Sequence, residues 1–140
     1  MDSAQKPLEL ILARNLITSL STPAFLVGDD GALLFYNEAA GTLLGVPFED
    51  AGRMEADEWG SAFGPVDDNG DPVPIEELPL TVALRDGRPA HANFRIRSAR
   101  GEQHDIEVSA FPIVGAAQSG AMAIFWLRNG DEPNRPGDAT

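Results

Sequence analysis

The sequence predicts one α+β domain, in which a five-stranded antiparallel sheet carries short helices over one face and an N-terminal helix on the other. Residues 90–98 and 105–114 alternate apolar and polar side chains, a pattern typical of strands with one dry face. Nearer the N-terminus, two short apolar segments flank a turn sequence, and a helical pattern precedes them. With 140 residues, 43% of them hydrophobic, the chain has the size of a single domain with its own core.

The first expected element is a helix over residues 7–20, within an N-terminal cap of residues 1–20 that we separate from a domain body at 21–128. Pro7 suits the first helical position, where no amide hydrogen is needed. The apolar residues of this helix recur at spacings of three and four and should line one side: Leu8, Ile11, Leu12, Leu16 and Leu20. This apolar stripe requires a surface that covers it.

A β-hairpin is expected next, with strands at residues 24–28 and 32–36. The intervening turn ends in Gly31, a residue that tolerates positive φ. Asn37 follows at once and is suited to cap the first turn of a short helix that Gly45 ends.

Residues 46–74 are rich in Gly, Pro and Asp, and Trp59 and Phe63 stand four apart on a short helix there. A further helix is predicted over residues 74–86, with Gly87 after it and with Leu78, Leu80, Val82 and Leu84 as its apolar members. The final strand, 121–128, is apolar on both faces, which predicts a central place in the sheet. The tail 129–140 has no large apolar residue, and we expect it to be disordered.

This order of elements resembles the PAS (Per-ARNT-Sim) domain, in particular the stand-alone bacterial type of sensor domain. Three segments carry the resemblance, which spans residues 16–128: Pro23-Ala24-Phe25-Leu26-Val27-Gly28-Asp29-Asp30-Gly31-Ala32-Leu33-Leu34-Phe35-Tyr36-Asn37-Glu38-Ala39-Ala40, then Leu43-Leu44-Gly45, and Ile106-Glu107-Val108-Ser109-Ala110-Phe111-Pro112-Ile113. PAS domains are input or dimerisation modules of histidine kinases, cyclases, phosphatases, sigma-factor regulators and transcription factors. The resemblance therefore implies a regulatory, signal-sensing domain that works with a signalling protein on another chain.

The resemblance further implies that a small apolar molecule is held between the sheet and the short helices. We expect twelve apolar residues to face that space: Leu43, Trp59, Phe63, Leu80, Leu84, Phe94, Ile96, Ile106, Val108, Ala110, Ala123 and Phe125. The same residues are equally compatible with a fully packed core, because apolar stripes usually form cores. In that case the domain is a ligand-free module for dimerisation or protein interaction.

A homodimer is also predicted, through the N-terminal helix and the outer face of the sheet. The residues expected there are Leu8, Ile11, Leu12, Leu16, Ile124 and Trp126, with Phe111 beside them. Exposed apolar patches of this kind are rare on soluble monomers. The helix has two options, to fold back on its own sheet or to pair with a second copy.

Several functions are disfavoured. The net charge of −12 disfavours binding to nucleic acid and anionic membranes. The sequence shows no signal-peptide pattern and no apolar run long enough to span a bilayer, so we expect a cytoplasmic protein. The absence of cysteine argues against the flavin photochemistry of the light-sensing PAS branch. The family's haem ligand is a histidine on the helix before the third strand, whereas His91 and His104 stand at strand starts. Residues 67–71 begin like a calcium loop but lack its glycine and final glutamate, which leaves a turn. No cofactor or metal is expected.

An enzyme is the least favoured function. Glu76 and Glu77 are neighbours on a helix and point apart, so they form no carboxylate pair. A small cone-shaped isomerase remains a distant alternative. It requires Tyr36, the only tyrosine of the chain, to face the same cavity as an aspartate.

Overall fold

The computed structural model describes residues 8–62, 64–114 and 118–128. Pro7, Phe63 and the tail expected to be disordered lie outside these residues. Within them, no helix is long and apolar enough to cross a membrane.

One five-stranded sheet forms the centre of the domain, in the order β2-β1-β5-β4-β3. Its strands, each antiparallel to its neighbours, are β1 Ala24–Gly28, β2 Leu33–Tyr36, β3 Ala90–Arg97, β4 Gln103–Val114 and β5 Gln118–Leu127. The doubly apolar last strand, β5, is central as predicted. The expected α+β fold class is confirmed.

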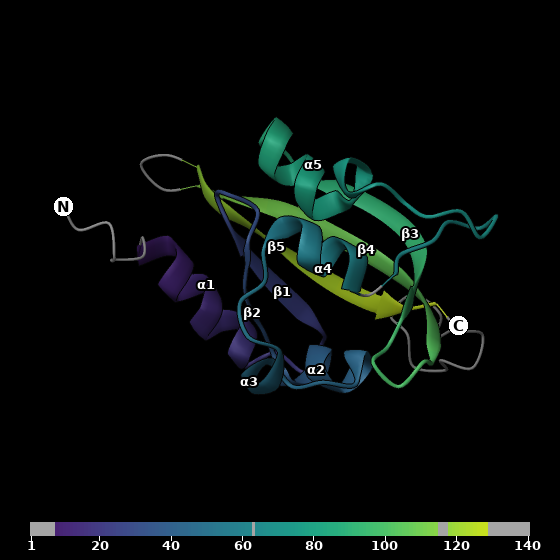
Figure 1. Ribbon diagram of the computed structural model, residues 1–140. Coiled ribbons are helices and arrows are strands. Elements are labelled where there is room, and N and C mark those ends of the chain that lie inside the picture. Colours follow the sequence, from purple (N-terminus) through teal and green to yellow (C-terminus); the bar gives the residue numbers. More distant parts are fainter. Residues whose placement is uncertain (1–7, 63, 115–117, 129–140) are drawn as a thin grey trace, which may run out of the picture.

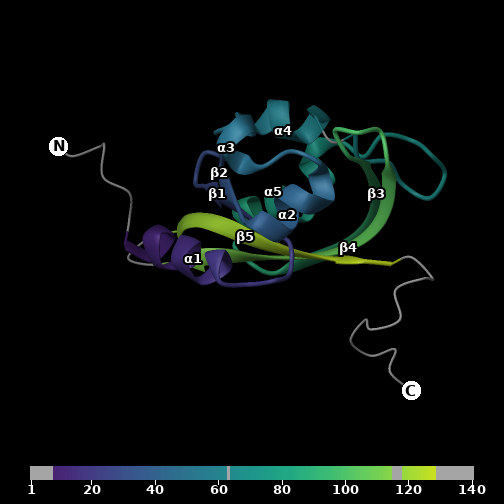
Figure 2. The same ribbon diagram turned by 90° about the horizontal axis from the view of Figure 1, so that it is seen from below.

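Helices lie on both faces of this sheet, as Figures 1 and 2 show. One face is covered by five short helices: α2 Glu38–Leu44, α3 Phe48–Ala51, α4 Ala56–Ala62, the 3-10 helix η1 Ile75–Glu77, and α5 Pro79–Asp86. The other face carries α1, Leu8–Thr18, which lies alone below the sheet in Figure 2. We call these the inner and the outer face.

Helix α1 packs on its own sheet, and of the predicted stripe only Leu20, just beyond the end of α1, takes part in this contact. Leu10 and Ile17 are buried against Leu26 of β1, with Ala13 and Leu20 beside them. The predicted residues Leu8, Ile11, Leu12 and Leu16 are instead 66%, 44%, 56% and 55% exposed. The spacing of three and four residues identified one apolar side of α1, but α1 has two such sides. The side that packs on the sheet is the one that the prediction left out.

Asn37, which directly follows β2, joins three elements at the open end of the hairpin. Its Oδ1 accepts hydrogen bonds from the backbone amides of Ala24 on β1 (3.1 Å) and Ala40 on α2 (3.0 Å). Its Nδ2 donates to the carbonyls of Ile17 (2.8 Å) and Thr22 (2.9 Å), and more weakly to that of Leu20 at 3.4 Å. The predicted helix cap therefore also holds the end of α1.

The helix predicted over residues 74–86 is two helices. Leu78 separates η1 from α5 and adopts an extended conformation, with φ −71° and ψ 142°. Pro79 follows it, and a proline disfavours helical geometry in the residue before it and donates no amide hydrogen. The single continuous helix was therefore wrong at this point.

Candidate functional site

An apolar cavity of about 40 Å³ lies between the inner face of the sheet and the helices over it. Its lining residues are all buried: Phe25, Leu44, Trp59, Pro65, Leu78, Pro79, Leu80, Phe94, Ile96, Val108 and Phe125. None of these side chains is ionisable. Phe25 and Phe125 form part of the floor, with ring centroids 4.8 Å apart.

The structure brings together six of the twelve residues predicted for the pocket: Trp59, Leu80, Phe94, Ile96, Val108 and Phe125. Four others are buried in the same core without lining the cavity: Leu43, Ile106, Ala110 and Ala123. Leu84 is partly buried against that core, and Phe63 lies outside the described residues.

Sequence reasoning missed five lining residues. Phe25 shares the inner face with Val27, a placement that alternation along β1 could have shown. Leu44 directly follows the predicted Leu43 on α2. Pro65 lies in irregular backbone, and Leu78 and Pro79 stand at the start of α5, where no periodic pattern yet assigns a side chain to a face.

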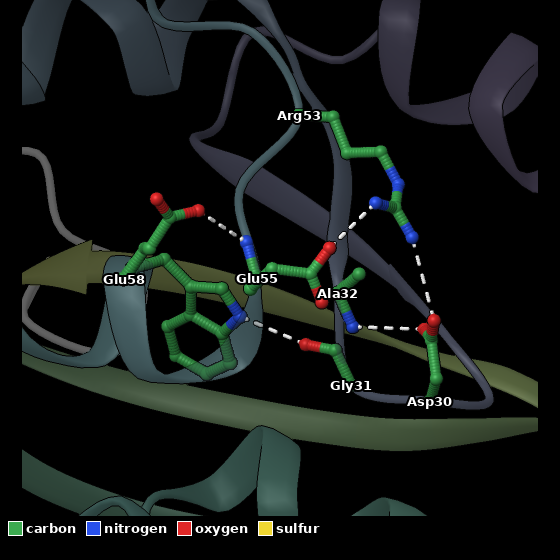
Figure 3. Close-up of polar contacts among 7 residues, drawn as sticks. Asp30, Gly31, Ala32, Arg53, Glu55 and Glu58 are labelled. Carbon is green, nitrogen blue, oxygen red and sulfur yellow. Dashed lines mark hydrogen bonds and ion pairs between the residues drawn. The ribbon is translucent and has the colours of Figure 1, made fainter.

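Trp59 closes the cavity on the side of α4. It is the one buried residue among those of α4 whose burial the structure describes, and its ring lines the cavity. Its indole Nε1 donates a hydrogen bond of 2.9 Å to the carbonyl of Gly31, in the β1–β2 turn (Figure 3). The polar end of this side chain is therefore satisfied outside the apolar space.

Two further contacts fasten the segment before α4 to the same hairpin. Arg53 bridges Asp30 at 3.3 Å and Glu55 at 2.7 Å (Figure 3). Met54 and Leu33 exchange backbone hydrogen bonds of 2.7 and 3.2 Å. Asp30 also accepts from the amide of Ala32, which fixes the turn that receives these contacts.

Tyr36 does not face the cavity. Its hydroxyl donates a hydrogen bond of 2.6 Å to the carbonyl of Val46. Burial, with Glu49 and Asp50 adding to it, raises the pKa of Tyr36 to about 12. The pairing of Tyr36 and an aspartate in one cavity, which the isomerase alternative requires, is absent from the part of the chain that the structure describes.

Neither histidine lines the cavity. His91 lies on the outer face, with Nδ1 3.1 Å from Ser109 Oγ and Nε2 3.4 Å from Glu107. His104 is the second residue of β4, and its Nε2 is 3.8 Å from the carboxylate of Glu102. Asp67 accepts from the amides of Asn69 and Asp71, so this acidic segment is a turn held by its own side chain.

A second apolar surface lies on the outer face beside α1. Phe111, Ile124 and Trp126 are partly buried there, whereas α1 packs against Ile113 and Met122. Arg14 stacks over the ring of Phe35 on the edge strand β2, 4.3 Å from its centroid. The opposite flank of α1 therefore faces the open half of the sheet.

No family model and no curated protein sequence matches the chain. Three solved structures show the same arrangement of elements. A PAS domain of a protein from Colwellia psychrerythraea has a TM-score of 0.60 at 19% identity, covering 84% of this chain and 96% of that one. The LOV protein of Rhodobacter sphaeroides has a TM-score of 0.69 at 16% identity, covering 89% and 70%.

The third structure, the PAS domain of nitrogen regulation protein NR(II) from Vibrio parahaemolyticus, has a TM-score of 0.58 at 17% identity and covers 83% of this chain and 97% of that one. Such low identities establish fold and leave function to be argued from the site. The resemblance seen in the sequence is confirmed at this level: the chain has the fold of PAS domains.

Proposed function

We propose that this protein is a signal-sensing regulatory domain that binds a small apolar molecule in its core. The observation that carries the proposal is the cavity between the sheet and the helices, lined by buried apolar side chains. Binding sites are typically concave and mostly apolar, and the PAS fold is one that sensor proteins use. The expectation that the protein is not an enzyme belongs to the same proposal.

The small volume of the cavity favours the second candidate, a ligand-free module for dimerisation or protein interaction. At about 40 Å³ the cavity has room for a few water-sized groups, whereas drug-sized ligands occupy about 300–1,000 Å³. A ligand must therefore be very small, or the surrounding helices must move to admit it.

The signal is proposed to leave the domain through the outer face, in contact with a second copy of the chain or a signalling protein on another chain. With 3.6 residues per turn, Leu12 and Leu16 lie on the flank of α1 opposite Arg14, and hence toward Ile124 and Trp126. Helix and sheet together present one apolar surface, and the same surface on a second copy matches it about a two-fold axis.

A matched pair of valines on β4 tests the pocket. Val108 lines the cavity, and Val114 is 62% exposed at the end of the same strand. Val108→Phe should fill the cavity and abolish any ligand that native mass spectrometry and organic extraction find with the purified wild-type protein. Val114→Phe should leave the ligand in place. A folded Val108→Phe protein with an unchanged ligand load would contradict the site.

A further inference from the structure

The segment Arg53–Ala62, which we call the α4 segment, covers the cavity and is held differently from the rest of the inner face. Helix α5 packs along β3, β4 and β5, whereas the principal helical neighbour of α4 is the short helix η1. The exposed residues of α4 are polar or small: Asp57, Glu58, Ser61 and Ala62. The segment therefore reaches the cavity through a single large side chain, Trp59.

Glycines with positive φ flank this segment, Gly52 directly before it and Gly64 two residues after its end. Gly52 has φ +72° and Gly64 has φ +54°, and no other group lies near the position of a β-carbon at either residue. Residues of this kind change backbone angles at low cost, and the space around them leaves the change unobstructed. They are suited to serve as hinges.

Between the hinges, the contacts to the β1–β2 hairpin act as a latch. Two of them are the bond from Trp59 to the carbonyl of Gly31 and the ion pair of Arg53 with Asp30 (Figure 3). The third is the backbone pair of Met54 and Leu33. The ion pair is exposed, with the two side chains 52% and 58% accessible, so it contributes little to stability. The latch is weak enough to open without unfolding of the sheet.

The cavity has a volume of only about 40 Å³, so a molecule larger than a few atoms needs a wall to move. The floor belongs to the sheet, and α5 is fixed to three strands. The α4 segment is the wall that has glycines of positive φ on both sides, and it packs along no strand as α5 does. Moving it withdraws the Trp59 ring and widens the cavity from one side.

We infer that the α4 segment is a latched lid, and that the cavity beneath it takes a hydrocarbon-like guest without hydrogen-bonding groups. This inference rests on the proposed ligand-binding function. The guest class follows from the lining: the side chains are hydrocarbon, and the only polar hydrogen among them, on the indole of Trp59, is used by Gly31. A polar group placed there would lose its bonds to water without replacement.

Benzene and xenon are suitable probes, because dry apolar cavities in proteins bind both. Binding is followed by NMR on the methyl groups of Leu44, Leu80 and Val108, which line the cavity. If the lid gates access, Arg53→Ala should raise the association and dissociation rates of benzene by the same factor, roughly two- to fivefold, and leave Kd unchanged. Trp59→Phe, which removes the hydrogen-bond donor, should also raise both rates.

The control is Arg88→Ala. Arg88 forms an ion pair with Asp86 at 3.6 Å, with side chains 72% and 29% accessible, at the end of α5 and away from the lid. Its removal should change neither rate. Hydrogen exchange gives a second readout that needs no guest, because the amides of Met54 and Leu33 should exchange faster in Arg53→Ala than in Arg88→Ala.

The outcomes distinguish failure of the lid from failure of the proposed ligand site. Benzene binding with the same rates in wild type, Arg53→Ala and Trp59→Phe overturns the lid and leaves the ligand site standing. Absence of any methyl shift with either probe, in wild type and in Arg53→Ala, overturns the lid together with the proposed ligand site. Equal exchange in Arg53→Ala and Arg88→Ala also overturns the lid.

Discussion

Asn37 offers a substitution that separates two functions of one side chain. Asn37→Asp keeps an oxygen that accepts from the amides of Ala24 and Ala40, so the cap of α2 survives. It removes the donor that holds the carbonyls of Ile17 and Thr22 at the end of α1. A carboxylate then stands against carbonyl oxygens at a site that is only 2% exposed.

The magnitude follows from counting bonds. Asn37 accepts two hydrogen bonds and donates two of good length, and each contributes about 1 kcal/mol. Asn37→Ala should therefore lower the free energy of unfolding by about 4 kcal/mol. Asn37→Asp should lose about 2 kcal/mol for the donated bonds, and more because of repulsion between the oxygens. Neighbouring carbonyls raise the pKa of the new carboxyl, so stability should return partly as the pH falls toward about 4.

Urea denaturation followed by tryptophan fluorescence measures these differences, and hydrogen exchange shows where the structure loosens. In Asn37→Asp, protection should fall in α1 and residues 19–23, and persist at the first turn of α2. Asn93→Asp, an exposed change of the same type on β3, should cost under about 0.5 kcal/mol. Equal exchange in α1 for wild type and Asn37→Asp, or a cost below about 1 kcal/mol, would refute the reasoning.

Three further predictions concern other parts of the fold. Leu12→Glu with Leu16→Glu should convert the proposed dimer to a monomer in light scattering, because four half-exposed leucines across two copies contribute about 4 kcal/mol, or roughly a thousandfold in Kd. The control, Asn15→Glu with Thr18→Glu, should leave the dimer intact. A wild-type protein that is monomeric at high concentration would end the dimer proposal. The pKa of Tyr36 is raised to about 12, so its stabilisation of the fold is fully present below about pH 10 and is lost as the pH rises through 12. Titration of the phenol at 295 nm checks this, because Tyr36 is the only tyrosine of the chain. A midpoint near 10 in the folded protein would contradict it. Gly120→Ala should lower the melting temperature sharply, because the new β-carbon would collide with the carbonyl oxygen of Val27 on the paired strand, and a melting temperature within a degree or two of wild type would count against this packing.

The fold was predictable because its elements have strong local signals. Alternation in β3 and β4 assigned Phe94, Ile96, Ile106 and Val108 to one face, and each is buried there. Strand β5 was assigned to the centre of the sheet because it is apolar on both faces. These signals depend only on the period of two along a strand, which the sheet preserves.

The faces of helices were less predictable. Helix α1 has apolar residues on two sides, and periodicity alone does not decide whether Leu10 and Ile17 or Leu12 and Leu16 meet the sheet. The break at Leu78 required weighting Pro79 above the apolar pattern around it. About half of the cavity lining was predicted, because Pro65 reaches the cavity from irregular backbone and Pro79 from the first position of α5.

The contact of α1 with the sheet has a consequence for how this domain can be transplanted. A fusion that begins at residue 21, the expected start of the domain body, would leave Ala24, Leu26 and Leu34 uncovered on the outer face. It would also leave the amide group of Asn37 with only the carbonyl of Thr22 to receive its two hydrogens. The smallest unit that can be grafted onto another protein therefore includes Leu8–Thr18, and a linker should join ahead of that helix rather than behind it.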